Sequence, residues 1–347
     1  MSSNPPFGDT MNLSPQHEHH SADSTGKRIK KSPRWDNEEG VAATVGTIMA
    51  LLVFLTFMGM FTNQFVPVWM SDNESTHMSE AIQQFVTLKS QIDNAISLYS
   101  NSLVAPAPIF VPVTLSAPGI PVFASPTAGI LSITPESKGV KPMFNITYTY
   151  QSNTSGTIYT YTLDQSNDGY SGGYLDLYCP NRYYVEEHIM YESGAVILNQ
   201  SDGEFILAGL QLSVKNLQTT THPSRVMQIT QVSVEGANKT IGGTGAKGVS
   251  AELTYANTIA YENIGAYGAT LNITITSEHG TAWEEYFIRT LTSQGLTQYN
   301  GFNITKQVHP KVGTTPAFYT VTISIDNIKI LDHTHATVIM GIGELGV

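Results

Sequence analysis

The sequence is poor in cysteine and in charge. Its 347 residues include one cysteine, Cys179, so no disulfide can form within the chain. Charged residues make up 13% of the chain, about half the roughly 25% that is usual for globular domains. Serine, threonine, asparagine and glycine take their place, a balance more typical of β-rich surface proteins than of cytosolic enzymes. The hydrophobic content of 41% is sufficient for a substantial core.

Basic residues are also scarce. The chain has 17 Lys and Arg against 28 Asp and Glu, which gives a formal net charge of −11. Because a phosphate-binding surface needs clustered Lys and Arg, we predict no nucleic-acid partner. Five basic residues do cluster, within the eight positions Lys27–Arg34 that precede the longest apolar run.

The motifs of common catalytic sites are absent too. The sequence has no G-x-S-x-G elbow and no H-E-x-x-H helix. The GGTGAKG segment at 242–248 lacks the spacing of a phosphate-binding loop. The adjacent carboxylates Glu186–Glu187 and Glu284–Glu285 would point apart on a strand or diverge on a helix. We therefore predict that the protein is not an enzyme and holds no cofactor or catalytic metal.

A long apolar run, VAATVGTIMALLVFLTFMGMF, occupies residues 41–61. Its 21 residues carry no charge, and as a helix they would span about 31 Å, which matches a bilayer core of roughly 30 Å. Trp35 and Trp69 flank the run as interfacial aromatics would. The run is too long and too uniformly apolar for a buried helix of a soluble protein. We therefore predict a transmembrane helix over 40–66, with the lipid bilayer as partner.

The charges around the run predict its orientation. The Lys27–Arg34 cluster places the N-terminal tail in the cytoplasm and the residues beyond 70 outside the cell. The run exceeds the usual 7–15 residues or so of a secretory signal core, and no A-x-A-like cleavage site follows it. We expect an uncleaved signal anchor in the cell membrane, with a single pass and an extracellular C-terminal domain.

Two segments resemble known archaeal proteins. EGVAATVGTIMALLVFLTF (39–57) resembles the N-terminus of archaeal type IV pilin-like proteins, in which a peptidase cuts just before the helix and the helix becomes a filament stem. The resemblance implies possible processing after Gly40. GGYLDLYCPNRYYVEEHIMYESGAVILNQSDGEFILAG (172–209) is similar to the ectodomain of archaeal membrane proteins of unknown function. Together they imply pilin-like or other envelope proteins as partners through the stem helix, and no known activity.

A second, amphipathic helix is predicted over 72–103. Its apolar stripe alternates spacings of four and three, and comprises Met78, Ile82, Phe85, Lys89, Ile92, Ile96, Tyr99 and Leu103, with only Lys89 off pattern. We expect the stripe to pack on the chain's own head, and the alternative is a seam with other helices. Pro67 is expected to kink or break the junction with the membrane helix.

The rest of the chain predicts a β-rich head. Eight prolines over 104–142 predict an extended segment against the head with two edge strands. From 143 to 347, period-two alternation and glycine-containing turns predict an antiparallel β-sandwich or rolled sheet. One inserted helix is expected, with a capping box of Thr281 and Glu284 at its start and Gly295 at its end. The predicted fold class is therefore mainly β with a long N-terminal helix. A disordered cytoplasmic tail at 1–39 precedes this helix.

Three surface features are candidates for function. N-x-S/T sequons beyond the membrane helix predict glycosylation candidates at Asn73, Asn145, Asn153, Asn199, Asn238, Asn272 and Asn303. Asp332, His333 and His335 suggest either a metal site, with His333 and His335 on one face of a strand, or, as we expect, an exposed or hydrogen-bonded strand pair. Ten of the 17 tyrosines lie between Tyr148 and Tyr191. They predict half-buried strand residues, with a platform for sugars or a protein as the alternative.

Overall fold

The computed structural model describes residues 37–102, 104, 106–137, 141–151, 155–163, 170–217, 224–262, 264 and 268–343. Most of the predicted tail, together with Leu103 and the sequon at Asn153, lies outside these residues. The chain divides into two units between Phe57 and Met58.

The N-terminal part of the described chain is helical. Helix α1 (Asn37–Met60) is followed by a five-residue π-helix, η1 (Phe61–Phe65), and then by α2 (Val66–Ser102). Pro67 was expected to kink or break the junction between the two helices. It is instead the second residue of α2, so the helix is not broken at Pro67. Proline crowds the carbonyl four residues earlier, that of Asn63, and the wider turn of η1 surrounds that residue.

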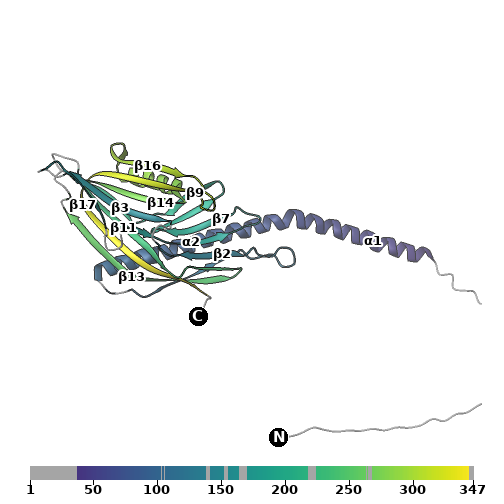
Figure 1. Cartoon of the computed structure of the whole chain (residues 1–347). Helices are drawn as coiled ribbons and strands as arrows, with labels where there is room; N and C mark the ends of the chain where they lie inside the picture. Colours follow the sequence, from purple (N-terminus) through teal and green to yellow (C-terminus); the bar gives the residue numbers. More distant parts are fainter. Residues whose placement is uncertain are drawn as a thin grey trace, which may run out of the picture. The chain divides into compact units, whose positions relative to one another are not determined.

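The head, shown in Figure 1, contains two sheets among the described residues, together with helices described below. The eleven-stranded sheet contains β1 (Ile109–Thr114), β3 (Met143–Gln151), β4 (Ile158–Thr162), β5 (Tyr170–Gly172), β10 (Leu212–Leu217), β11 (Ser224–Gly236), β13 (Ala246–Glu262), β14 (Ala269–Ser277), β15 (Thr297–Gln298), β16 (Gly301–His309) and β17 (Phe318–Gly343). The six-stranded sheet has the order β12 (Lys239–Gly243), β2 (Gly129–Thr134), β6 (Tyr174–Cys179), β7 (Glu187–Glu192), β8 (Ala195–Gln200) and β9 (Gly203–Ala208).

Strand β17 organises the larger sheet. Its first half pairs with β14 and β16, and its second half pairs with β13 and β11. Most pairings are antiparallel, whereas β11–β17 and β15–β16 are parallel. The predicted fold class is confirmed: a long apolar N-terminal helix precedes a mainly β, sandwich-like head.

The proline-rich segment contributes two strands, of which only one is an edge strand. β1 contains Pro112 and pairs only with β13, as expected for a strand that lacks one backbone donor. β2 lies between β12 and β6, so the prediction of an edge position is wrong for this strand. Pro126 and Pro135 fall outside β2, which therefore keeps all its backbone donors.

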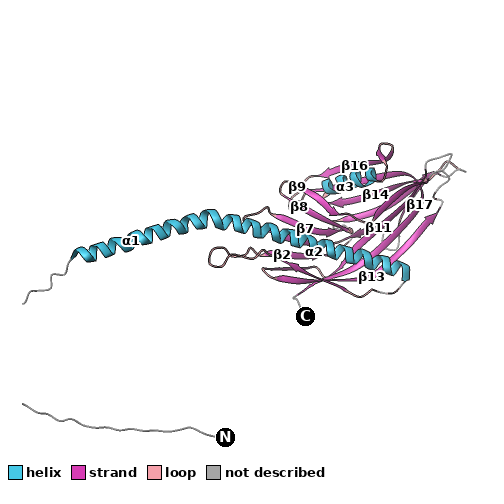
Figure 2. Ribbon diagram, turned by 180° about the vertical axis from the view of Figure 1, so that it is seen from behind, coloured by secondary structure: helices cyan, strands magenta, loops and turns pink. Residues whose placement is uncertain are grey.

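Helix α2 is an internal element of the head. Its buried side chains are Met78, Ala81, Phe85, Leu88, Ile92, Ala95 and Ile96, and they belong to one hydrophobic core with residues of β1, β13, β7 and β8. Figure 2 shows α2 lying across β7 and β13, which it contacts. Lys89, the residue off pattern, is buried and pairs with Asp93 one turn later. The stripe thus packs on the chain's own head and is not free to form a seam.

Helix α3 (Gly280–Ser293) lies in a second core with β9, β14, β16 and β17, and buries Trp283, Phe287 and Leu291 as predicted. The capping box is wrong, because no side chain of the helix caps its start. Gly295 ends the helix as predicted, with φ +85° and a Leu296 N–H bond to the carbonyl of Leu291 (3.0 Å).

Candidate functional sites

The apolar helix is the first candidate site. Among the described residues, one helix is long and apolar enough to cross a membrane, and none of its most apolar stretch is buried in protein. Leu52, for example, keeps 61% of its surface exposed. A helix that is apolar on all sides needs an apolar environment all round. The helix is therefore consistent with single-pass membrane anchoring.

Gly40, the predicted processing position, lies inside α1. The Thr44 hydroxyl donates to the Gly40 carbonyl at 2.6 Å, so the Gly40–Val41 peptide bond is part of the helical backbone. The small residues Ala42, Gly46 and Ala50 recur every four positions and are exposed. Cleavage after Gly40 stays a prediction.

A buried carboxylate joins α2 to the loop between β6 and β7. Glu74 accepts hydrogen bonds from the backbone N–H groups of Arg182 (3.1 Å), Tyr183 (2.7 Å) and Tyr184 (2.7 Å). Its side chain is almost completely buried. Sequence reasoning missed this site because the partners lie more than a hundred residues apart.

A polar recess of about 210 Å³ has several titratable side chains in its walls. It is lined by Lys141, Pro142, Tyr174, Asp176, His188, Met190, Glu192, Asn199, Ser277, Glu278 and His279. Asp176 Oδ1 lies 3.2 Å from His188 Nδ1, and the ring of Tyr178 stacks on His188 with centroids 4.5 Å apart. The polar side chains of the recess can receive a small cationic or hydroxylated group. No sequence motif indicated that these residues come together.

His279, which lines the recess, stands at the start of α3, and Glu204 holds this start. Glu204 of β9 accepts the N–H groups of Thr281 (2.7 Å) and Ala282 (3.0 Å), and its second oxygen lies 3.1 Å from His279 Nδ1. Glu204 therefore takes the place of the predicted capping box. The buried carboxylate of Glu192 accepts a hydrogen bond from Trp283 Nε1 at 2.9 Å.

The charges of this cluster shift one another's pKa values. Burial alone lowers the pKa of His279, but its hydrogen bond to Glu204 and the negative charges of Glu192 and Glu204 raise it overall. Burial alone raises the pKa of Glu204, but His279 and the backbone donors of α3 lower it overall. For Glu192, burial dominates and the pKa is raised. The hydrogen bonds of Glu204 support the start of α3.

The predicted histidine pair is hydrogen-bonded on its strand, and the alternative of exposed histidines is wrong. His333 Nε2 lies 2.9 Å from Gln231 Oε1, and His335 Nε2 lies 3.1 Å from Ser233 Oγ. Both rings are buried, whereas Asp332 is on the opposite face of β17 and accepts from Gln228. Within the described residues, no group of three or more His, Cys, Asp or Glu side chains is arranged to hold a metal ion.

Part of the tyrosine-rich segment forms a cluster of stacked rings. Tyr148 faces Tyr161 and Tyr150 faces Tyr159 across β3 and β4, with centroids 5.3 and 5.6 Å apart. The ring planes within these pairs are 18° and 25° from parallel, so the rings are stacked face to face on each other. Burial raises the pKa of Tyr148. The half-buried interpretation fits Tyr148 and Tyr150, while Tyr159 and Tyr161 are exposed.

The described sequons differ in accessibility. Asn238, in the turn between β11 and β12, and Asn303, on β16, are exposed. Asn73, Asn145, Asn199 and Asn272 are half-buried. The amide of Asn73 donates to the carbonyl of Pro118 (3.2 Å), and Asn272 Oδ1 accepts from Ser324 (2.7 Å). Asn238 and Asn303 are thus the most accessible acceptors, and glycosylation stays a prediction.

No protein-family model, no curated protein and no solved structure matches the chain. The resemblance of 39–57 and 172–209 to archaeal pilin-like membrane proteins therefore stays a prediction based on those residues.

Proposed function

We propose that the chain is a single-pass, membrane-anchored cell-surface protein with a structural or interaction role in an archaeal envelope or in a pilus- or secretion-type assembly. The single observation that carries the proposal is α1, whose apolar side chains cover its whole circumference and are exposed. The basic cluster at 27–34 supports a cytoplasmic N-terminus.

The burial of α2 in the head limits the surfaces through which the chain would contact other proteins. The heptad-like stripe is buried in the head, so contacts with other copies or other envelope proteins would form through α1 or the head surface. The exposed row Ala42, Gly46 and Ala50 supports close helix approach within the bilayer.

Protease treatment of intact cells tests the proposal. We expect added protease to remove epitopes of the head at 143–347 while an epitope tag in residues 1–30 survives until the membrane is permeabilised. Alkaline carbonate should leave the chain in the membrane pellet. A head that is protected in intact cells, or a chain released by carbonate, contradicts the proposal.

A processed minor pilin is the second candidate function, favoured by the position of Gly40 directly before the apolar run 41–61. Mass spectrometry of the mature chain separates the two: an N-terminus at Val41 supports a processed filament subunit, and a retained Met1 or Ser2 supports the uncleaved anchor.

A receptor for carbohydrates or another ligand is the third candidate, favoured by the exposed Tyr159 and Tyr161 at the edge strand β4. Glycan-array binding of the detergent-solubilised full chain tests it. Binding that is lost on Tyr159→Ser and Tyr161→Ser supports a receptor, and binding that survives these changes contradicts it.

A further inference from the structure

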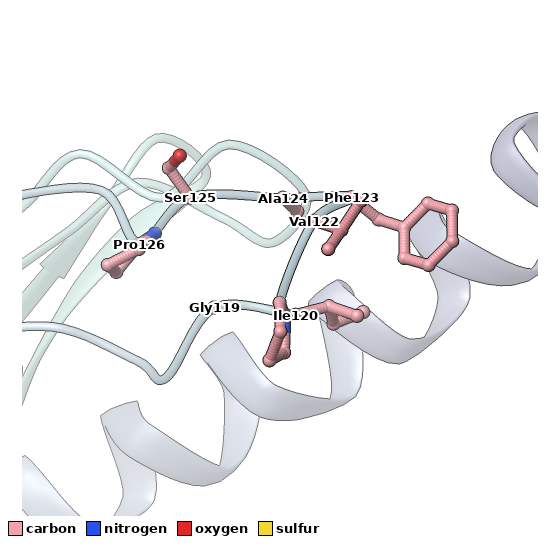
Figure 3. A pocket seen from close by; sticks show the side chains of 8 residues that line it. Gly119, Ile120, Val122, Phe123, Ala124, Ser125 and Pro126 are labelled. Carbon is pink, nitrogen blue, oxygen red and sulfur yellow. The ribbon is translucent and has the colours of Figure 1, made fainter. Parts of the chain in front are cut away.

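The loop Gly119–Pro126, between β1 and β2, exposes apolar side chains at its tip. Its sequence is GIPVFASP, and no Asp, Glu, Lys or Arg occurs between Asp93 and Glu136. Val122 at the tip is 99% exposed. Figure 3 shows the loop as a narrow hairpin beside a helix, with Val122 and Phe123 at its turn. In water, this degree of exposure of a valine and its neighbours is unfavourable.

The hairpin is held in a defined conformation. The Ile120 N–H donates to the Ala124 carbonyl and the Ala124 N–H donates to the Ile120 carbonyl, both at 2.9 Å. Val122 has φ +71°, a left-handed conformation that is costly for a β-branched residue. A Cβ on Gly119 would lie 2.5 Å from the Ala124 carbonyl oxygen, so the turn needs glycine there. The fold therefore displays Val122 at the tip despite the conformational cost.

The loop is attached to the end of the apolar run. The ring of Phe123 lies 5.1 Å, centroid to centroid, from that of Phe61, the last residue of the run 41–61. Phe61 also contacts Phe65 (5.9 Å) and Trp69 (5.6 Å). Tryptophan, such as Trp69, concentrates where a membrane helix leaves the hydrocarbon, at the level of the lipid headgroups. The contact with Phe61 therefore places the loop at the level of that boundary.

We propose that the loop Gly119–Pro126 inserts into the headgroup region of the membrane that anchors the chain, so that the head contacts lipid at a second point. Continuity with the apolar run and the lack of charge favour lipid over a protein partner. The inference rests on the proposed membrane anchoring. Such insertion would hold the head against the bilayer, because two lipid contacts, the helix and the loop, restrict rotation of the head more than the helix alone.

Single-cysteine probes in the full-length chain test the proposal. The variants Leu52→Cys, Val122→Cys and Val312→Cys would each be labelled with an environment-sensitive fluorophore and reconstituted in phosphatidylcholine vesicles, with and without lipids that carry a quencher. Burial raises the pKa of the native Cys179 thiol to about 12, so the wild-type chain should label little. Val312 is the matched control, a valine that is 72% exposed in a similar tight turn.

We expect lipid quenching at position 52, at least threefold stronger quenching at position 122 than at 312, and a blue-shifted emission at 122. Equal quenching at 122 and 312, with position 52 quenched, overturns the loop proposal and leaves the anchor intact. An unquenched position 52 overturns the anchoring itself. A blue shift at 122 without lipid quenching means that a second copy covers the loop, which also overturns the proposal. Ser125→Cys is a second probe in the same loop if Val122→Cys does not fold.

Discussion

Helices α1 and α2 follow one another in the chain, yet their apolar residues have opposite surroundings. Phe54 in α1 is 55% exposed, whereas Phe85 in α2 is fully buried. α1 is apolar on every side, and α2 has one apolar stripe that packs against β1, β13, β7 and β8. The comparison teaches that helical propensity and apolar content do not determine what covers a helix. The distribution of apolar residues around its circumference does.

The largest effect is expected from charge in α1. Val53→Arg together with Phe54→Arg should oppose membrane insertion by about 5–7 kcal/mol, since each arginine near the centre of a spanning helix costs about 2.5–3.5 kcal/mol. The measurement is the fraction of chain that resists alkaline carbonate extraction. The control is Gln91→Arg with Leu98→Arg, which adds the same charge to the exposed face of α2 and should leave the fraction unchanged. Equal retention of both double variants would contradict the difference between the helices.

The second experiment truncates one phenylalanine in each helix, Phe85 in α2 and Phe54 in α1. Phe85→Ala should lower the free energy of unfolding of the head by about 3–5 kcal/mol, because it leaves a cavity in the core around α2. Phe54→Ala should change it by less than about 0.5 kcal/mol. Denaturant unfolding of the full chain in detergent micelles, followed by circular dichroism, measures both. A similar loss in the two variants would mean that α1 also packs on protein.

The sequence predicted the regular elements well because their periodicity is local. Leu271, Ile273 and Ile275 are buried on one face of β14, as their alternation indicates, and the α2 stripe follows the predicted spacing. The all-round apolar character of α1 likewise needs no tertiary information. These features depend only on neighbours along the chain.

The polar attachments could not be predicted in the same way. Glu74 accepts hydrogen bonds from a loop more than a hundred residues away, and Glu204 of β9 accepts hydrogen bonds from the start of α3. Neither pairing leaves a local pattern. Thr281 and Glu284 have the spacing of a capping box, but Glu204 already accepts the N–H of Thr281, and Glu284 pairs with Lys306. The central position of β2 is also set by distant strands.

Glu74 sharpens the comparison, because it ties α2 to the head by polar contacts in addition to its apolar stripe. Glu74→Ala should lower the free energy of unfolding by about 3 kcal/mol, since it leaves three backbone N–H groups without their acceptor. Amide hydrogen exchange at 182–184 should accelerate in the same variant. Glu80→Ala removes an exposed carboxylate from the same helix and should change neither quantity. Unchanged exchange at 182–184 in Glu74→Ala would exclude this attachment.

The smallest effect concerns α3, which is attached by Glu204 and His279 in the way that Glu74 attaches α2. The pKa of Glu204 is lowered from 4.5 and that of His279 is raised from 6.5. Their ion pair therefore stabilises the fold fully between pH 4.5 and 6.5. This stabilisation is lost as the pH falls through the lowered pKa of Glu204, and also as the pH rises through the raised pKa of His279.

Glu204→Gln should accordingly cost about 1–2 kcal/mol within that window and less on either side, because a neutral amide keeps an acceptor for α3 but loses the charge. Thermal unfolding of both chains across pH 3–9 or so measures the difference. Glu285→Gln, on the exposed face of α3, should give a difference that does not vary with pH. A Glu204→Gln difference that is equally flat would mean that Glu204 holds α3 through its backbone hydrogen bonds alone. The polar attachment of α3 would then resemble a neutral helix cap and would make no use of His279.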